Sequence, residues 1–452
     1  MTGTGNRKDQ LVLGILIGGV GNHVGAWRRP GSRIEEKYSL SLFSDLVRWA
    51  EDAKLHAVFL ADGLNLDRST LRSQPHAGLE PVTLLSALAA QTTNIGLIGS
   101  ISTTFSEPFN VARQLASLDH LSNGRAGWNI VTSAWGEENF GRELPAHADR
   151  YALAEEYLRA ALALWDSWDA DAIRLDREQG FYADKDLVRE INHRSKHFTI
   201  QGPLNIARPP QGRPLIAQAG SSESGKTFAA GYADIVFTTG RQSLADSQAF
   251  YTDLKARVSA AGRDPGQLKI LPGISPIIGQ TETEAKALQR ELNGYIDFES
   301  GRTRLAKQLA GTDLSGLELT DRIPAERLPA VNEVQGRRSR YEVFRELIVK
   351  EHYTLRQLIE YEVSSAGHYV PVGDPEQIAN LLQDRFENGA ADGFILLPSY
   401  VPEGFQLLTD AVVPILQDRG LFQREYAGST LRENLGLDPV AGTIRNGAQL
   451  TA

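Results

Sequence analysis

Short apolar runs alternate with amphipathic segments along most of this chain, and this alternation restricts the fold more than any other feature. Between the runs lie segments with helical spacing of apolar residues, such as 39–55 and 108–121. Buried strands joined by helices are typical of a parallel sheet in the α/β class. Eight runs have the length and composition of buried strands, which favours a closed (β/α)8 TIM barrel over an open sheet. They span residues 11–17, 57–61, 95–101, 126–131, 214–219, 234–238, 268–275 and 393–397.

Two stretches interrupt this alternation, and we interpret both as long insertions in a single barrel domain of residues 1–452. Residues about 167–213 are polar, rich in charge and closed by RPPQGRP. Residues about 295–370 are irregular or helical. We expect both insertions to cover the mouth of the barrel, where loops set specificity in such folds. The C-terminal tail, about 425–452, is expected to be peripheral.

Composition narrows the function classes. A net charge of -9 disfavours a nucleic-acid or anionic-membrane partner. The absence of cysteine excludes disulfides and thiolate metal sites, and it fits a reducing, cytoplasmic location. The apolar run at 11–20 is short and interrupted by glycines, so neither a secretory signal nor a membrane span is expected. His193 and His197 lack the glutamate of an HExxH motif, and no metal site is predicted.

Residues 220–227, GSSESGKT, match the phosphate-loop pattern between a predicted strand and a predicted helix. An ATP or GTP hydrolase is therefore one candidate. Its position at mid-chain counts against it, as does Asp234, which begins a strand instead of ending one. A safer prediction is an anion site made by the Gly220 backbone and the hydroxyls of Ser221 and Ser222 at a helix N-terminus. The alternative is a helix start merely capped by one of these serines.

Polar residues occur at the ends of the first four apolar runs, where α/β proteins form active sites. Asn129 lies inside a buried run, so its amide must find a partner, and a ligand would supply one. Thr103 and Thr104 follow the third run, where their hydroxyls reach either a ligand or solvent. Asp62 ends the second run, where it lines a site or caps a turn.

Three segments carry a resemblance to a known family: NHVGAWRRP at 22–30, LDHLSNGRAGWNIVTS at 118–133 and AQAGSSESG at 217–225. Together with FLAD at 59–62 and EPVTLLSALAA at 80–90, they are similar to the bacterial-luciferase-like flavin-dependent monooxygenases. The branch is that of nitrilotriacetate, dibenzothiophene-sulfone, pristinamycin and long-chain-alkane monooxygenases. The similarity runs from about residue 10 to 275 and continues more weakly to about 420.

The resemblance implies a two-component monooxygenase. Reduced FMN (FMNH2) would come from a separate NAD(P)H:flavin reductase, and a flavin C4a-(hydro)peroxide would oxidise a small organic substrate, with C–N or C–S cleavage as one outcome. The segment GGVGNHVG has Val24 where a dinucleotide fingerprint needs glycine, which is consistent with a separate reductase. A flavin- or F420-binding barrel without oxygenase activity is a further candidate. A homo-oligomer, dimer or tetramer, is expected. Polycarboxylate, thioether, sulfone and nitrogen-heterocycle substrates all remain open.

The resemblance also assigns roles to individual residues. Gly220, Ser221 and Ser222 would hold the FMN phosphate. His147 and Tyr151 would contact the phosphate and ribityl chain, although His147 could instead be an exposed residue at a helix start. Asp62, Thr103, Thr104 and Asn129 would lie beside the flavin ring.

His23 is the predicted catalytic residue, because it follows the first strand at a matching family position and can transfer a proton near neutral pH. The alternative is a loop histidine that only shapes the pocket. The chain departs from the family at 134–138, which is shorter than usual and contains the bulky Trp135, so substrate choice is expected to differ there. Arginines at 28, 29, 337, 338 and 340 would suit an anionic substrate, but exposed arginines are common.

Overall fold

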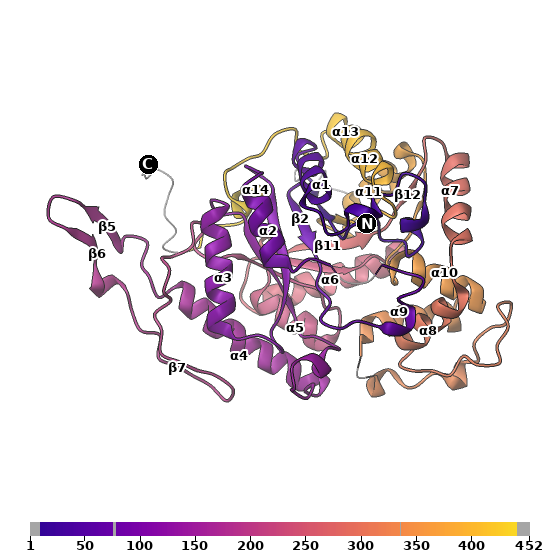
Figure 1. The fold of residues 1–452 in the computed structure, drawn as a ribbon, viewed down its shortest axis with the longest axis horizontal. Coiled ribbons are helices and arrows are strands. Elements are labelled where there is room, and N and C mark those ends of the chain that lie inside the picture. Colours follow the sequence, from indigo (N-terminus) through magenta and orange to yellow (C-terminus); the bar gives the residue numbers. More distant parts are fainter. Residues whose placement is uncertain (1–9, 76–77, 335, 441–452) are drawn as a thin grey trace, which may run out of the picture.

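The computed structural model describes residues 10–75, 78–334 and 336–440. Its centre is a closed barrel of eight parallel strands (Figure 1). Each apolar run forms one barrel strand, which confirms the predicted (β/α)8 barrel. Around the barrel the order is β1 (Val12–Leu16), β14 (Gly393–Leu396), β11 (Lys269–Ile274), β10 (Ile235–Thr239), β9 (Leu215–Gln218), β4 (Ala126–Val131), β3 (Gly96–Ser102) and β2 (Ala57–Leu60).

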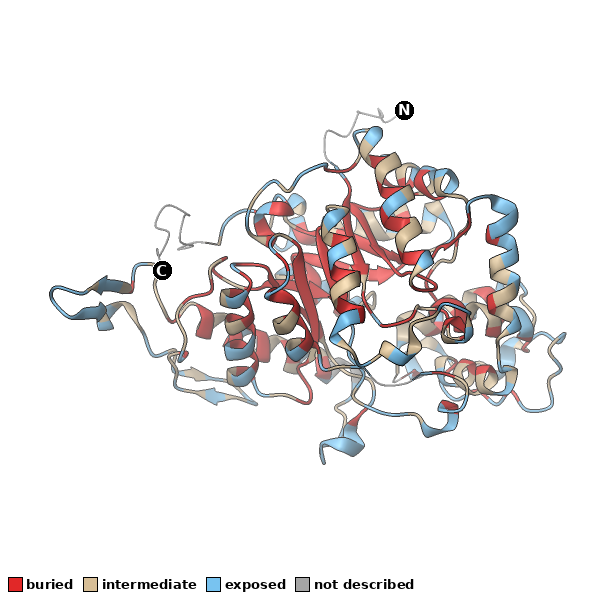
Figure 2. Cartoon of the chain, turned by 45° about the horizontal axis from the view of Figure 1, so that its top comes forward, coloured by how far each residue is buried: buried red, intermediate tan, exposed pale blue. Residues whose placement is uncertain are grey.

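Helices cover the outside of the barrel, and local signals define their ends. Ser39 accepts a hydrogen bond from the Ser41 N–H and caps α1. Glu80 caps α2, whose first residue is Pro81. The barrel strands are almost entirely buried, whereas the helices expose their outer faces (Figure 2). The outer helices are α1 (Leu40–Asp52), α2 (Pro81–Ala89), α3 (Pro108–Leu121), α4 (His147–Trp165), α5 (Glu223–Tyr232), α6 (Leu244–Ala260), α7 (Glu282–Gly294), α11 (Pro375–Glu387), α12 (Glu403–Leu407) and α13 (Val413–Asp418).

The first insertion does not cover the barrel mouth, and that expectation is wrong. It forms two antiparallel hairpins, β5 (Ile173–Asp176) with β6 (Phe181–Ala183) and β7 (His193–Arg194) with β8 (Thr199–Ile200). These hairpins extend away from the barrel (Figure 1). The reason is topological: the insertion follows the C-terminus of α4, where the chain has already returned toward the amino ends of the strands.

The second insertion covers the carboxyl ends of the strands. It contains α8 (Phe298–Gln308), α9 (Arg338–Val349) and α10 (Leu355–Ser365). These helices have their own hydrophobic core, which includes Leu305, Phe344 and Ile359. Residues 336–340 and 365–368 of this insertion line the large cavity described below. The insertion is therefore a helical layer over the mouth of the barrel.

Part of the C-terminal tail is not peripheral, contrary to expectation. The short helix α14 (Leu431–Asn434) packs under the amino end of the barrel. Leu431 is fully buried, and its N–H donates to the Gly124 carbonyl at 3.0 Å. Gly96 makes room for it, because a Cβ at that position would meet the Leu431 methyl groups. The tail thus closes the end of the barrel opposite the cavity. Among the helices described, none is both long and apolar enough to cross a membrane.

Candidate functional site

A cavity of about 380 Å³ lies at the carboxyl ends of the barrel strands. Its floor and walls come from residues after β1, β2, β4 and β9, and its cover comes from the second insertion. Ligand pockets in proteins typically measure about 300–1,000 Å³, so this cavity can hold a small molecule or cofactor. Six of the predicted site residues line it: Asp62, Asn129, Tyr151, Gly220, Ser221 and Ser222.

The loop between β9 and α5 forms one end of the cavity. Ser222 accepts a hydrogen bond from the Gly225 N–H at 3.2 Å and caps α5, while the role of this loop in phosphate binding stays a prediction. Gly220 lies in a tight cradle, since a Cβ there would stand 2.3 Å from Gln218 Nε2 and 2.4 Å from the Tyr151 hydroxyl. A helix N-terminus with glycine backbone and hydroxyls suits an anion such as phosphate.

The first turns of α4 form the wall next to this loop. Tyr151 is hydrogen-bonded to Ser222 and Gln218, and burial raises the pKa of its phenol despite these bonds. Arg150 donates from Nη1 to the Ser133 carbonyl at 2.7 Å and also lines the cavity. Sequence reasoning missed Arg150, although it lies between two predicted residues. The backbone of His147 begins α4, but its side chain lies outside the described part of the structure.

Two buried amides present unpaired acceptors at the cavity. Asn129 donates from Nδ2 to the Ser100 hydroxyl at 2.8 Å, while its Oδ1 has no partner within the described structure. Gln218, the last residue of β9, likewise has an unpartnered buried Oε1. Buried acceptors without partners mark places where a ligand N–H or O–H can bind. A flavin ring carries both N–H and carbonyl groups on one edge, so this amide pair fits it. Gln218 was missed, although a polar end to a buried strand is a signal for it.

Asp62 lines the cavity and also makes a local turn contact. Its Oδ1 accepts a hydrogen bond from the Gly63 N–H at 2.8 Å, as the turn-capping alternative expects. Burial raises the pKa of this carboxyl above its usual value. The two interpretations of Asp62 are therefore compatible.

Thr103 and Thr104 are not brought to the cavity. The Thr103 hydroxyl donates to the Val131 carbonyl at 3.3 Å, and both side chains are buried beyond the end of β3. Ser100 lines the cavity in their place, because it pairs in register with Asn129 and faces the same side. Thr104 Oγ1 is buried without a partner in the described structure, and the flavin contact expected of Thr103 and Thr104 stays a prediction.

His23 also does not line the cavity. It is 2% exposed, its Nδ1 accepts from the Gly25 N–H at 3.0 Å, and its Nε2 donates to Asn293 Oδ1 at 3.3 Å. Burial lowers the pKa of its imidazole to about 4, so the ring is neutral near neutral pH. These bonds fasten the loop after β1 to the end of α7, which favours the loop-shaping alternative. Asn22, its neighbour, lines the cavity instead.

The second insertion adds arginines and a histidine that face the barrel mouth. Arg337 lies over the Trp135 ring, with its guanidinium carbon 4.6 Å from the ring centroid. Arg340 donates from Nη2 to His368 Nε2 at 2.6 Å. His368 donates from Nδ1 to the Gly273 carbonyl and stacks on Phe237. His368 was missed, because nothing in its local sequence distinguishes it from other polar residues of the insertion.

Trp135 also lines a smaller pocket of about 60 Å³, which shares Asp62 and Arg337 with the large cavity. The unusual 134–138 loop therefore borders the site, where substrate choice was predicted to differ. Its effect on specificity stays a prediction.

Lys226 points away from the cavity. Its ammonium group pairs with Asp253 at 2.7 Å and with Glu223 at 2.5 Å, on the side of α5 that faces α6. A phosphate-loop lysine must instead reach the phosphates of the nucleotide. The match at 220–227 is therefore not a nucleotide-hydrolase site.

Similarity to known proteins extends along the whole chain. A family model described as luciferase-like monooxygenase matches residues 21–392. N-acetyl-S-(2-succino)cysteine monooxygenase of Bacillus subtilis (strain 168) is 44% identical over 438 residues, which cover 96% of this chain and 98% of the relative. Nitrilotriacetate monooxygenase component A of Aminobacter aminovorans is 42% identical, with coverage of 95% and 97%. A crystal structure of riboflavin lyase with modified FMN and riboflavin has a TM-score of 0.84 and 30% identity, and covers 95% of this chain and 97% of that one.

Proposed function

The chain belongs to the luciferase-like monooxygenase family, and on this premise we propose that it is the oxygenase of a two-component system that uses reduced FMN and O2. The observation that carries the proposal is the cavity at the barrel mouth. It combines a phosphate-type helix N-terminus at α5 with two unpaired buried amide acceptors. The relatives support it, since one is named component A of a monooxygenase and another was crystallised with a modified FMN.

In this proposal the chain holds the cofactor at two places. The Gly220 backbone, Ser221, Ser222 and Tyr151 bind the phosphate. Asn129 and Gln218 hold the polar edge of the ring by accepting and donating hydrogen bonds. When bound, the reduced flavin supplies the electrons that activate O2. The family relatives are named monooxygenases, which speaks against a flavin- or F420-binding barrel without oxygenase activity.

The second insertion excludes bulk water from the barrel mouth, which protects oxygen chemistry from side reactions. Asp62 is a candidate proton carrier, because it lines the cavity and its carboxyl pKa is raised by burial. His23 positions the loop that carries Asn22 and does not transfer a proton itself.

The proposed substrate is a small organic molecule that is cleaved at a C–S or C–N bond. Two relatives are named for such molecules: N-acetyl-S-(2-succino)cysteine contains a C–S bond and nitrilotriacetate contains C–N bonds. Both also carry carboxylates. The expected homo-oligomer stays a prediction, to be checked by sedimentation.

The test uses the purified chain with FMN, NADH and a separate flavin reductase. We expect binding of FMN, and O2 consumption that is coupled to product only when the chain and a substrate such as N-acetyl-S-(2-succino)cysteine or nitrilotriacetate are both present. Heavy-oxygen-labelled O2 should place one labelled atom in the organic product or its immediate precursor. Failure to bind FMN in either redox state would overturn the proposal. Uncoupled O2 consumption without labelled product, across a panel of thioethers and amines, would overturn its oxygenase part.

A further inference from the structure

We infer that Arg337, Arg338 and Arg340, here called the arginine cluster, bind two carboxylates of the substrate, so that this enzyme acts on a di- or polycarboxylate. The inference rests on the proposed function, because it concerns the substrate side of the same cavity. All three arginines line that cavity from the N-terminal end of α9.

The guanidinium groups of the arginine cluster retain open hydrogen-bond donors. Within the part of the chain that is described, the Arg337 guanidinium has neither a hydrogen bond nor an ion pair, and its recorded contact is with the Trp135 ring. Arg340 bonds to His368 through Nη2, but its Nη1 is buried without a partner. Arg338 donates to the carbonyls of Val334 and Asn332, which leaves its positive charge uncompensated.

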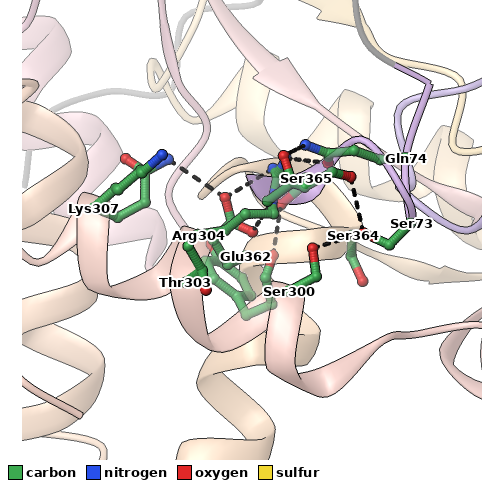
Figure 3. Close-up of polar contacts among 12 residues, drawn as sticks. Ser73, Gln74, Ser300, Thr303, Arg304, Lys307, Glu362, Ser364 and Ser365 are labelled. Carbon is green, nitrogen blue, oxygen red and sulfur yellow. Dashed lines mark hydrogen bonds and ion pairs between the residues drawn. The ribbon is translucent and has the colours of Figure 1, made fainter. Parts of the chain in front are cut away.

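The acidic residue that acts on the arginine cluster electrostatically is already paired. Glu362 on α10 acts electrostatically on both Arg337 and Arg340. However, its two carboxylate oxygens accept hydrogen bonds from Arg304 Nε at 2.7 Å and Nη2 at 2.9 Å. Figure 3 shows this pair within a polar network that also contacts Gln74. Glu362 therefore neutralises Arg304 and leaves the arginine cluster without a counter-ion.

The cavity as a whole is strongly positive. Four arginines line it, at 150, 337, 338 and 340, against a single acidic residue, Asp62. Burial and the neighbouring Arg337 lower the pKa of the Arg340 guanidinium. Arg337 and Arg304 also repel each other. Clustered arginines without a counter-ion repel one another, and an anionic ligand would remove this cost.

The position of the arginines on α9 adds to this cost. Arg337 is the N-cap of α9, without a capping side chain, and Arg338 and Arg340 lie in its first turn. A helix N-terminus carries partial positive charge, so cations there are unfavourable and anions are favoured. Three arginines at this position are consistent with a helix end adapted to an anionic ligand.

Carboxylates fit this site better than a single phosphate. A planar guanidinium binds a carboxylate through two parallel hydrogen bonds, and Arg337 and Arg340 offer two separate guanidinium groups. The cofactor phosphate has its own site at α5, and none of the recorded contacts of Arg337 or Arg340 involves the 220–222 loop. We therefore expect the arginine cluster to stay unpaired after the cofactor has bound.

The test uses the full-length chain saturated with FMN, and the probe is tricarballylate, a tricarboxylate without a cleavable heteroatom bond. Binding is measured by calorimetry and by the fluorescence change of Trp135, identified by comparison with Trp135→Phe. We expect tricarballylate to bind at least tenfold more tightly than propionate, and more weakly at high salt. Arg337→Gln and Arg340→Gln should each weaken tricarballylate binding at least tenfold, while FMN affinity stays within threefold.

Arg345→Gln is the matched control, because it removes the same charge from the exposed face of α9 and should leave both affinities unchanged. Arg337→Lys and Arg340→Lys keep the charge but lose the planar fork, and should restore binding only in part. Melting curves check that each variant folds. Equal binding of tricarballylate and propionate would overturn the inference, as would variants that bind tricarballylate normally. A parallel loss of FMN affinity would assign the arginines to the cofactor phosphate and also overturn it. If the wild-type chain does not bind FMN, the proposed function fails instead.

Discussion

The two ends of the barrel treat charged side chains in opposite ways. At the amino end, buried charged side chains bind partners within the chain, although Arg432 Nε and the neighbouring Gln211 Oε1 and Asn434 Nδ2 have no partner in the described structure. Asp234 binds Arg432 at 2.9 Å, and Asp119 accepts hydrogen bonds from Gln211 and from the Ala126 N–H. Arg125 donates to carbonyls and to the Thr92 hydroxyl. These groups hold strands, loops and the C-terminal tail together.

At the carboxyl end, by contrast, the arginine cluster faces the cavity without a carboxylate partner, and Asn129 and Gln218 keep free acceptors. The contrast separates structural from functional charged groups by one criterion: whether partners within the chain bind the charge. It predicts that substitutions at the amino end reduce stability without affecting ligands, and that substitutions at the carboxyl end do the reverse.

The largest effect is expected from Asp234→Ala at the amino end. This change leaves the buried Arg432 without its carboxylate and removes the acceptor for the Ile216 N–H. Breaking a buried ion pair costs about 3–5 kcal/mol. The melting temperature should therefore fall by several degrees, while FMN affinity of the folded protein stays within threefold. Asp438→Ala, on the exposed part of the same tail, is the control. A large loss of FMN affinity in folded Asp234→Ala would contradict the proposed difference between the two ends of the barrel.

Gly220→Asp, at the carboxyl end of the barrel, should have the second largest effect, and this effect should be on FMN affinity. The new side chain would crowd Gln218 and Tyr151 and place a negative charge where phosphate is proposed to bind. We expect FMN affinity to fall at least 100-fold, or about 3 kcal/mol, with little change in melting temperature. Gly231→Asp is the matched control, since the same change there, near the C-terminal end of α5, meets open space. Unchanged FMN affinity in Gly220→Asp would show that the FMN phosphate does not bind at the N-terminus of α5.

His56 provides a smaller, pH-dependent test of the amino end. Its Nδ1 accepts a hydrogen bond from the Leu13 N–H, and burial lowers the pKa of its imidazole to about 4. Between pH 6.5 and 4 the unfolded chain therefore binds a proton that the folded chain does not, and stability falls as pH falls. The slope is roughly 1 kcal/mol per pH unit for each such group. His56→Gln should remove the contribution of His56 to the pH dependence of the stability.

The measurement compares melting temperatures of wild type and His56→Gln from pH 7 to pH 4. The difference between the two proteins isolates His56, because His23, which has a similarly lowered pKa, titrates in both. Asp119, whose pKa is raised by burial to about 6, also contributes equally to both, with the opposite sign. A pH-independent difference would show that His56 is not buried in its neutral form.

The fold was predictable because it depends on patterns that repeat along the chain. Each barrel strand is a separate apolar run, and helix starts such as Ser39 and Pro81 are marked by local residues. The position of site residues was predictable where a residue lies within or just after a strand and belongs to a family motif, as for Asn129, Gly220 and Ser222. These positions are fixed by strand direction, which the sequence pattern reveals.

The rest of the site could not be predicted, because it depends on tertiary contacts that the sequence does not show. Whether Ser100 or Thr103 faces the cavity depends on barrel register, which sets which residues of β3 point inward. The burial of His23 could not be predicted, because its partner Asn293 comes from a helix 270 residues away, and its catalytic role stays a prediction. The arginine cluster was noticed, but its unpaired state appears only when Glu362 is seen to bind Arg304.

Lys226→Ala should have the smallest effect, and it tests whether α5 contributes to ligand binding only through its N-terminus. Lys226 makes partly exposed ion pairs with Glu223 and Asp253, and such pairs contribute about 0–1 kcal/mol. We therefore expect a small fall in melting temperature and FMN affinity within twofold of wild type. ATP binding should be undetectable in both proteins. Because Lys226 lies one turn from Ser222 on the same helix, a strong loss of FMN affinity would mean that the lysine swings into the cavity. A lysine that is paired within the chain would then bind the ligand, and pairing would not distinguish structural from functional charged residues at α5.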